Sequence, residues 1–175
     1  MRALLLCLMY VCQTAWVSPG GLAAQQAPAR LTGNAKGVSM DWFMEDGYGL
    51  WAMSYRYSTL RPGAVGADLG LSLFPQTLPA GVLALAGDFG ASYNLPVPGG
   101  SLLLKAGGSG LTALGTGLTL IAPGFHVGGT VLIQTGDRSG LRIDVIRHYY
   151  LPNGGEIAPI WSVGLGFAVI PRRPS

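Results

Sequence analysis

The sequence has few charged side chains, almost no cysteine and no cluster of basic residues. Charged residues make up 11% of the 175 positions, whereas soluble domains carry about 25%. The two cysteines, Cys7 and Cys12, both lie in the apolar N-terminal segment, so the rest of the chain can form neither a disulfide nor a thiolate metal site. The net charge is +3 and the longest basic run is Arg172-Arg173, which argues against a nucleic-acid binder.

What the chain has instead is apolar side chains and glycine. Hydrophobic residues make up 49% of the sequence, and 28 positions are glycine. This composition is too apolar for a disordered chain and too poor in charge for an ordinary soluble surface. It predicts one folded domain whose outside faces something other than water.

The N-terminal segment has the three parts of a secretory signal. Arg2 supplies a positive charge, residues 3–17 are almost entirely apolar, and small residues precede a cleavage point after Ala23 or Ala24. An uncleaved membrane anchor is the alternative, but an apolar stretch of about 15 residues is shorter than the roughly 20 that a spanning helix needs. The expected division of the chain is a cleaved signal peptide (1–24), a short linker (25–36), one domain (37–170) and a C-terminal tail (171–175).

From about Val38 onward, apolar and polar residues alternate with a period of two, and clusters of Gly, Pro, Asn or Asp interrupt the pattern. This is the signature of strands joined by turns, and no segment changes to the 3.6-residue period of a helix. The pattern predicts eight strands, over residues 37–45, 49–59, 64–74, 82–94, 100–107, 123–134, 139–150 and 158–170.

Residues 107–123 are the hardest segment to assign, because they fit either a long loop or an extension of the strands on both sides. The wider region 106–136 has no charged residue and is long enough for a transmembrane helix. Its many glycines, Pro123 and the β-branched pair Thr130-Val131 make that helix unfavourable.

The two faces of each predicted strand differ sharply. In the second strand, Trp51, Met53, Tyr55 and Tyr57 share one face, while the other face carries small residues and Arg56. A soluble β-sandwich or a lipocalin-like binder would place the bulky face inside. However, the opposite face is mostly Gly, Ala and Ser with a few charges of both signs, which suits the narrow interior of a barrel better than a water-facing sheet.

Aromatic residues on the bulky face gather near the strand ends, as expected where a barrel crosses two membrane interfaces. The predicted membrane girdle has Trp51, Phe125, Tyr149 and Trp161 near one rim, and Tyr55, Tyr57, Tyr93 and Phe167 near the other. In hydrocarbon an open sheet edge would leave backbone groups unpaired, so the sheet must close. We therefore predict an all-β fold: a single closed antiparallel up-and-down transmembrane β-barrel of about eight strands, with an interior filled by side chains.

Two C-terminal segments carry a resemblance to a known class of proteins. The segments GFHVGGTVLIQTGDRSGLRIDVIRHYY and IWSVGLGFAVI resemble the last three strands of small porin-family, OmpA-like outer-membrane barrels. The resemblance implies an outer-membrane location with short turns in the periplasm and longer loops outside the cell. It implies outer-membrane lipids, lipopolysaccharide and the barrel assembly machinery as partners, and no cofactor. Such barrels commonly end in an aromatic residue that the assembly machinery reads, whereas this chain continues past Phe167.

Charged side chains on the small-residue face are the first candidates for function. This predicted lumen charge network comprises Asp41, Arg56, Asp68, Asp88, Lys105, Arg142 and Asp144. A structural set of ion pairs is the simplest interpretation, because charges taken out of water must be paired. A proton or ion path through a narrow gate is the alternative.

The two histidines are the second candidates. If the turn between the sixth and seventh predicted strands centres on Asp137, then His126 and His148 lie directly opposite each other, since each is 11 residues away from it. Neighbours at that spacing could share a proton or a metal. A stable metal site needs three or four ligands, and the sequence offers no evident third ligand, so we expect no metal.

The segment RHYYLPNGGE resembles the region around the catalytic histidine of outer-membrane lipid A 3-O-deacylases. That resemblance implies His148 as a base and Glu156 as the acid that orients it. The serine expected two residues after the histidine is Tyr150 here, so the attacking hydroxyl is missing. We therefore expect a barrel of structural, adhesive or narrow-channel type without catalytic activity, with a lipid-modifying enzyme as the alternative.

Overall fold

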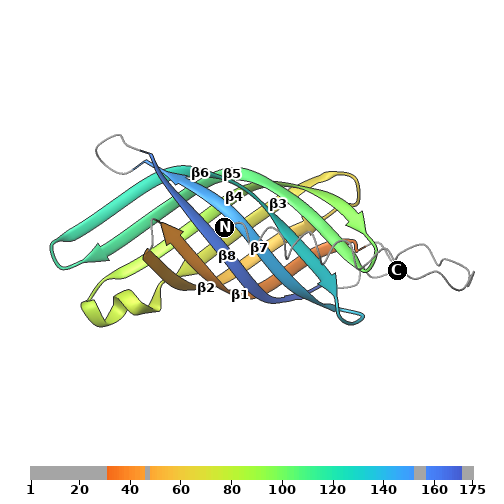
Figure 1. Ribbon diagram of the computed structural model, residues 1–175, viewed down its shortest axis with the longest axis horizontal. Coiled ribbons are helices and arrows are strands. Elements are labelled where there is room, and N and C mark those ends of the chain that lie inside the picture. Colours follow the sequence, from red (N-terminus) through yellow and green to blue (C-terminus); the bar gives the residue numbers. More distant parts are fainter. Residues whose placement is uncertain (1–30, 46–47, 152–156, 171–175) are drawn as a thin grey trace, which may run out of the picture.

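The computed structural model describes residues 31–45, 48–151 and 157–170. Eight strands form one closed barrel, each antiparallel to both neighbours, and β1 pairs with β8 to complete the ring (Figure 1). The strands are β1 Gly33–Glu45, β2 Tyr48–Leu60, β3 Val65–Leu73, β4 Leu83–Val97, β5 Gly100–Gly115, β6 Leu118–Gln134, β7 Ser139–Tyr150 and β8 Ala158–Val169. The all-β, up-and-down barrel predicted from the alternating pattern is confirmed.

Helix contributes little to the described residues. A short 3-10 helix, η1 (Pro75–Ala80), connects β3 to β4, and Gly81 ends it in the left-handed region at φ 70°. Within the described ranges, no helix combines the length and the apolarity needed to cross a bilayer. The helix considered for residues 106–136 is therefore not formed, and β5 and β6 occupy most of that region.

Residues 107–123 extend the two flanking strands instead of forming a long loop. β5 runs to Gly115, β6 starts at Leu118, and Gly117 makes the tight turn at φ 75°. The resulting β5–β6 hairpin projects past the barrel rim, at the left of Figure 1. The period-two signal is weak there because polar and apolar residues do not separate by face: Ser109 shares its face with Leu111, and Thr112 lies on the other face.

Among the described strands, the projecting part of β6 is paired on one side only. It pairs with β5 along residues 118–123, whereas the pairing with β7 begins at Gly124. The carbonyl of Pro123 accepts a hydrogen bond of 2.8 Å from the Leu151 N–H on the β7 side. The proline nitrogen faces the same side and has no hydrogen to donate, so the β6–β7 ladder ends there.

The N-terminal boundary of the barrel differs from the prediction. β1 begins at Gly33, inside the segment predicted as linker, because the alternation continues backward with Ala35 buried inside and Lys36 exposed outside. The predicted signal peptide and the C-terminal tail lie outside the described residues.

The two ends of the barrel have different connections. Both ends of the described chain lie at one end, because Lys36 pairs with Val169, and the turns there are short (residues 61–64, 98–99 and 135–138). We call this the terminal end. The opposite end, the loop end, carries η1, the β5–β6 hairpin and the connection after Tyr150.

The barrel interior has an apolar cluster at each end and a polar middle. At the terminal end the buried cluster consists of Leu31, Ala35, Leu60, Leu103, Leu132, Ala168 and Ile170. At the loop end it consists of Phe43, Ala52, Phe74, Ala84 and Ala86, with Leu111, Ala113 and Ile160 packed against them. Buried charged and hydroxyl side chains fill the space between.

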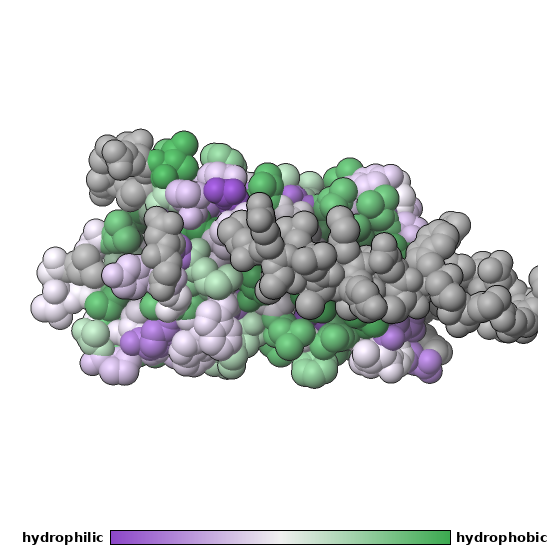
Figure 2. Space-filling view, in the orientation of Figure 1, coloured by the Kyte–Doolittle hydropathy of each residue, from purple (hydrophilic) through white to green (hydrophobic). Residues whose placement is uncertain are grey.

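The outer wall is apolar, which is the opposite of a soluble sandwich. Leu165 is 58% exposed and Phe167 is 68% exposed, while Arg56 is completely buried and Asp144 almost so. Figure 2 shows hydrophobic residues along the wall of the barrel. The soluble β-sandwich considered as an alternative would reverse this arrangement, so the structure contradicts it.

Gly164 faces the interior where a methyl group has no room. A Cβ at this position would overlap the carboxylate of Asp41, whereas a Cβ at the outward-facing Gly87 would meet nothing within 4 Å. Overpacking a well-packed interior costs about 1–3 kcal/mol. We expect Gly164→Ala to lower the denaturant midpoint of the folded protein in detergent micelles, and Gly87→Ala to leave it nearly unchanged. Equal midpoints for the two variants would contradict the packing described here.

Candidate functional site in the barrel interior

Arg56 lies at the centre of the interior, between two carboxylates from different strands. Its Nη2 donates to Asp41 Oδ2 at 2.6 Å, and its Nη1 donates to Asp88 Oδ2 at 2.5 Å. The Ser39 hydroxyl donates to the other oxygen of Asp41 at 2.6 Å. The planar guanidinium thus links β1 to β4 across the lumen, which a lysine could not do with the same geometry.

A second group of charges lies toward the terminal end. Lys105 Nζ is 2.9 Å from Asp68 Oδ1 and 3.4 Å from Asp144 Oδ1. Arg142 donates to both Asp144 oxygens, from Nε at 2.7 Å and from Nη2 at 3.0 Å. Hydroxyls complete the group, since Ser58 donates to Asp68 and Thr130 donates to Asp144, each at 2.5 Å.

All seven residues predicted as lumen charges are buried and form ion pairs with one another. Four aspartates face three cations, so the set carries one excess negative charge when both histidines are neutral. Pairing of this kind is what allows charges to exist out of water, because an unpaired buried charge is very costly. The arrangement matches a structural network.

The histidines lie between this network and the loop-end cluster. His148 Nδ1 is 3.3 Å from Asp88 Oδ1, and His148 Nε2 is 2.9 Å from the Ser162 hydroxyl. Ser109 donates to Asp88 Oδ1 at 2.9 Å and lies 3.0 Å from His126 Nδ1. A proton on Nδ1 of His148 would be donated to Asp88, leaving Nε2 to accept the Ser162 hydroxyl, a tautomer assigned from the network.

The two histidines are paired in the register that the sequence predicted. His126 faces His148 across β6 and β7, with ring centroids 6.0 Å apart. The His148 ring also stacks between Phe43 at 5.5 Å and Tyr150 at 5.7 Å. Within the described ranges, no group of three His, Cys, Asp or Glu side chains has the geometry for a metal ion.

The resemblance to lipid A deacylases assigned roles to His148 and Glu156. Glu156 lies outside the described residues. In the structure Asp88 contacts His148 on one ring nitrogen and Ser162 contacts it on the other, so acid, base and hydroxyl stand in the order of a catalytic triad. Ser162 is only 1% exposed, and an ester could reach its hydroxyl only if the loop end of the barrel opened.

Sequence reasoning missed the hydroxyl residues of the interior, although a signal for them was present. Ser58, Ser109, Thr130 and Ser162 all occupy inward positions of the period-two pattern, and each contacts a charged or imidazole group. Serine and threonine are common on the inner face, and the sequence does not indicate which of them face a carboxylate.

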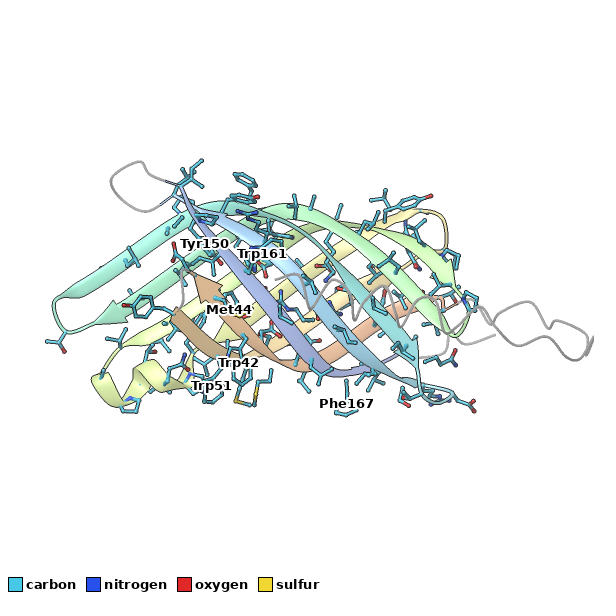
Figure 3. The ribbon with its side chains drawn as sticks, viewed as in Figure 1. Trp42, Met44, Trp51, Tyr150, Trp161 and Phe167 are labelled. Carbon is cyan, nitrogen blue, oxygen red and sulfur yellow. The ribbon has the colours of Figure 1, made fainter. Side chains whose placement is uncertain are left out.

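Aromatic side chains form a belt on the outer wall near the loop end (Figure 3). Trp42 pairs with Trp51 across β1 and β2, and Phe125 stacks on Tyr149 at 4.8 Å. Trp161 lies beside Met44 across β1 and β8. Trp42 and Met44 were not among the residues predicted for the girdle.

A second group of outward aromatics lies nearer the terminal end. Tyr55, Tyr93 and Phe167 are exposed there, and Tyr57 is partly exposed. Figure 3 places Phe167 away from the tryptophans of the loop-end belt. Outward aromatic side chains therefore lie near both rims of the barrel wall, and Phe89, which is 64% exposed, lies midway along β4.

Comparison with known proteins identifies the fold. No family model and no curated protein matches the chain. The N-terminal β-barrel domain of Pseudomonas aeruginosa OprF superposes with a TM-score of 0.54 at 15% identity, covering 78% of this chain and 97% of that one. Neisserial surface protein A gives 0.53 at 14% identity, covering 78% and 95%. A de novo designed transmembrane β-barrel gives 0.51 at 15% identity, covering 82% and 97%. The resemblance to small eight-stranded barrels is thus confirmed for the fold.

Arg56 provides a direct test of the charge network. Arg56→Met removes the cation that pairs Asp41 with Asp88, and breaking such a buried pair costs about 3–5 kcal/mol because it leaves uncompensated charge. We expect a large drop in the denaturant midpoint, and partial recovery when Asp41→Asn and Asp88→Asn are added. The control is Lys36→Met, which removes an exposed outward cation and should have little effect. A similar small effect for both single variants would contradict a structural role for the network.

Proposed function

We propose that the protein spans the outer membrane of a Gram-negative envelope as a sealed barrel with a structural or adhesive role. The observation that carries the proposal is the inside-out distribution of side chains: paired charges in a closed interior and apolar residues on the outer wall. In water, such a wall would cost about 25 cal/mol for each Å² of exposed apolar area. In a bilayer the same surface is favourable.

Strand lengths support a membrane-spanning role. A tilted strand crosses the hydrocarbon with about 9–11 residues, and the shortest strand, β3, has 9 residues. The longest strand, β6, has 17 residues, so its surplus extends beyond the rim as the β5–β6 hairpin. Short turns at the terminal end fit the periplasmic side, and the longer connections of the loop end fit the outside of the cell.

The interior supports a sealed barrel rather than a channel. An ion that crossed the lumen would have to pass Leu103 and Leu132 at the terminal end and Phe43 and Phe74 at the loop end, all of which are buried. Between these clusters the charged groups are held by one another. An interior of eight strands leaves space for little more than its own side chains.

A second candidate function is acyl transfer at Ser162. The specific observation in its favour is that Asp88, His148 and Ser162 are aligned as acid, base and hydroxyl. In that role the Ser162 oxygen would attack the carbonyl of a lipid ester while His148 Nε2 takes the hydroxyl proton. We rank this function second because Ser162 is buried, so that a lipid ester cannot reach its hydroxyl in this structure.

Two measurements test the sealed barrel. We expect the purified protein to require detergent and to shift in electrophoretic mobility on boiling, because a closed membrane barrel stays folded in detergent until heated. We also expect no steady ionic conductance after reconstitution into planar bilayers. Solubility without detergent would contradict the proposed membrane location. A stable single-channel current would contradict the proposed sealed interior.

The acyl-transfer candidate has its own test. Purified protein incubated with lipopolysaccharide or phospholipid is expected to release no fatty acid, and Ser162→Ala is expected to leave the products unchanged. Ser101→Ala, at another buried inward serine that lies away from the histidines, is the matched control. Fatty acid release that disappears in Ser162→Ala and His148→Ala but persists in Ser101→Ala would make the enzyme the primary function.

A further inference from the structure

Arg147 is unusual among the cations of the barrel. Five basic side chains lie in the described strands, and Arg56, Lys105 and Arg142 point inward to carboxylates. Lys36 and Arg147 point outward. Lys36 is exposed near the terminal end of β1. Arg147 lies within the loop-end aromatic belt, on the wall that we assign to lipid.

Aromatic rings hold the Arg147 guanidinium in place. Its Cζ lies 5.2 Å from the centroid of the Tyr149 ring and 5.0 Å from that of Trp161, which faces it directly across β7 and β8. Phe125 also stacks on Tyr149, with ring centroids 4.8 Å apart. Cation–π contacts orient a guanidinium over an aromatic ring. They leave its N–H groups free to donate hydrogen bonds in the plane of the guanidinium.

Within residues 31–45, 48–151 and 157–170, the guanidinium also lacks an acidic partner. Among the residues that the structure describes, no carboxylate forms an ion pair with Arg147, and its Nε is buried without a hydrogen-bond acceptor. Every inward cation, by contrast, contacts at least one aspartate. The Arg56 Nε is unsatisfied in the same way, so the difference between the two arginines is the carboxylates on the Nη groups of Arg56. The Nη groups of Arg147 have no such partner in the described part of the chain, and they can donate to an anion at the outer surface.

The position of Arg147 indicates the chemistry of that anion. Tryptophan and tyrosine side chains lie at the level of lipid headgroups in membrane proteins, so Arg147 is at headgroup level if the barrel spans a membrane. Val127 lies directly opposite Arg147 across β6 and β7, and Val145 lies two residues further toward the middle of β7. Both are exposed and offer an apolar surface to an acyl chain. A cation above an apolar strip complements a phosphate joined to hydrocarbon tails.

We propose that Arg147, oriented by Tyr149 and Trp161, binds a phosphate group of an outer-leaflet lipid, in the form of the phosphorylated lipid A moiety. The inference rests on the proposed function, because only a membrane-spanning barrel with its loop end outside brings this site to the outer leaflet. Arginine suits phosphate because its planar fork can donate two parallel hydrogen bonds. Lipid A supplies both the phosphate and the acyl chains for Val127 and Val145.

Native mass spectrometry of the full-length protein in detergent can count bound lipid A directly. We expect wild type to retain lipid A, and Arg147→Gln to weaken retention by about tenfold or more, as the loss of a charge-assisted hydrogen bond predicts. Arg147→Lys should fall between them, since it keeps the charge but not the fork. Lys36→Gln removes an outward cation at the other end and should bind as wild type does.

Two further binding experiments, with dephosphorylated lipid A and with inorganic phosphate as competitor, distinguish the possible sources of the phosphate. Dephosphorylated lipid A should bind wild type as weakly as intact lipid A binds Arg147→Gln, and inorganic phosphate should not compete at equal concentration. Retention unchanged in Arg147→Gln, an equal loss in Lys36→Gln, or full competition by inorganic phosphate would each overturn the inference.

Failure of this inference can be distinguished from failure of the proposed function. Each variant is first checked for the mobility shift on boiling, which reports the folded barrel. A wild-type protein that shows no shift and stays in solution without detergent contradicts the membrane barrel itself. A wild-type protein that shows the shift but binds intact and dephosphorylated lipid A equally contradicts only the phosphate site.

Discussion

The narrow interior of an eight-stranded ring is the constraint on which the rest of this structure depends. Because the ring encloses little more than its own side chains, every inward position must be small, or matched to a partner across the lumen. Gly164 leaves room for Asp41, and Gly70 leaves room for Arg56. The long arginine can then reach from Asp41 to Asp88 and connect strands that are not neighbours in the sheet.

The same constraint limits what the protein can do. Charges that neutralise one another are poor ligands for a passing ion, and the apolar clusters at both ends keep water away from them. The alignment of Asp88, His148 and Ser162 arises in this crowded setting, where hydroxyl and imidazole groups satisfy a carboxylate. The groups that remain available to bind another molecule lie on the outer wall and at the loop end, where Arg147 and the aromatic belt are found.

The period-two alternation was sufficient to predict the barrel, the inward position of its charges and the pairing of His126 with His148. The length of β5 and β6 could not be predicted, because in residues 107–123 hydroxyl, glycine and leucine residues occur on both faces and do not mark an inner one. Partners across the lumen could not be predicted either. Arg56 and Asp88 are 32 positions apart, and their meeting depends on the stagger of the whole ring, which no local pattern records.

One consequence of the projecting hairpin concerns association between molecules. Beyond the rim, β6 presents backbone groups along residues 118–122 that no β7 residue pairs with. An exposed strand edge of this kind can pair with strands of other chains, and repeated pairing leads to aggregation. Pro123 restricts that growth, since a foreign strand would reach a position with no N–H after only a few residues and then meet Leu151, which already occupies the proline carbonyl. The barrel can thus extend a long hairpin from its rim while limiting self-assembly through it.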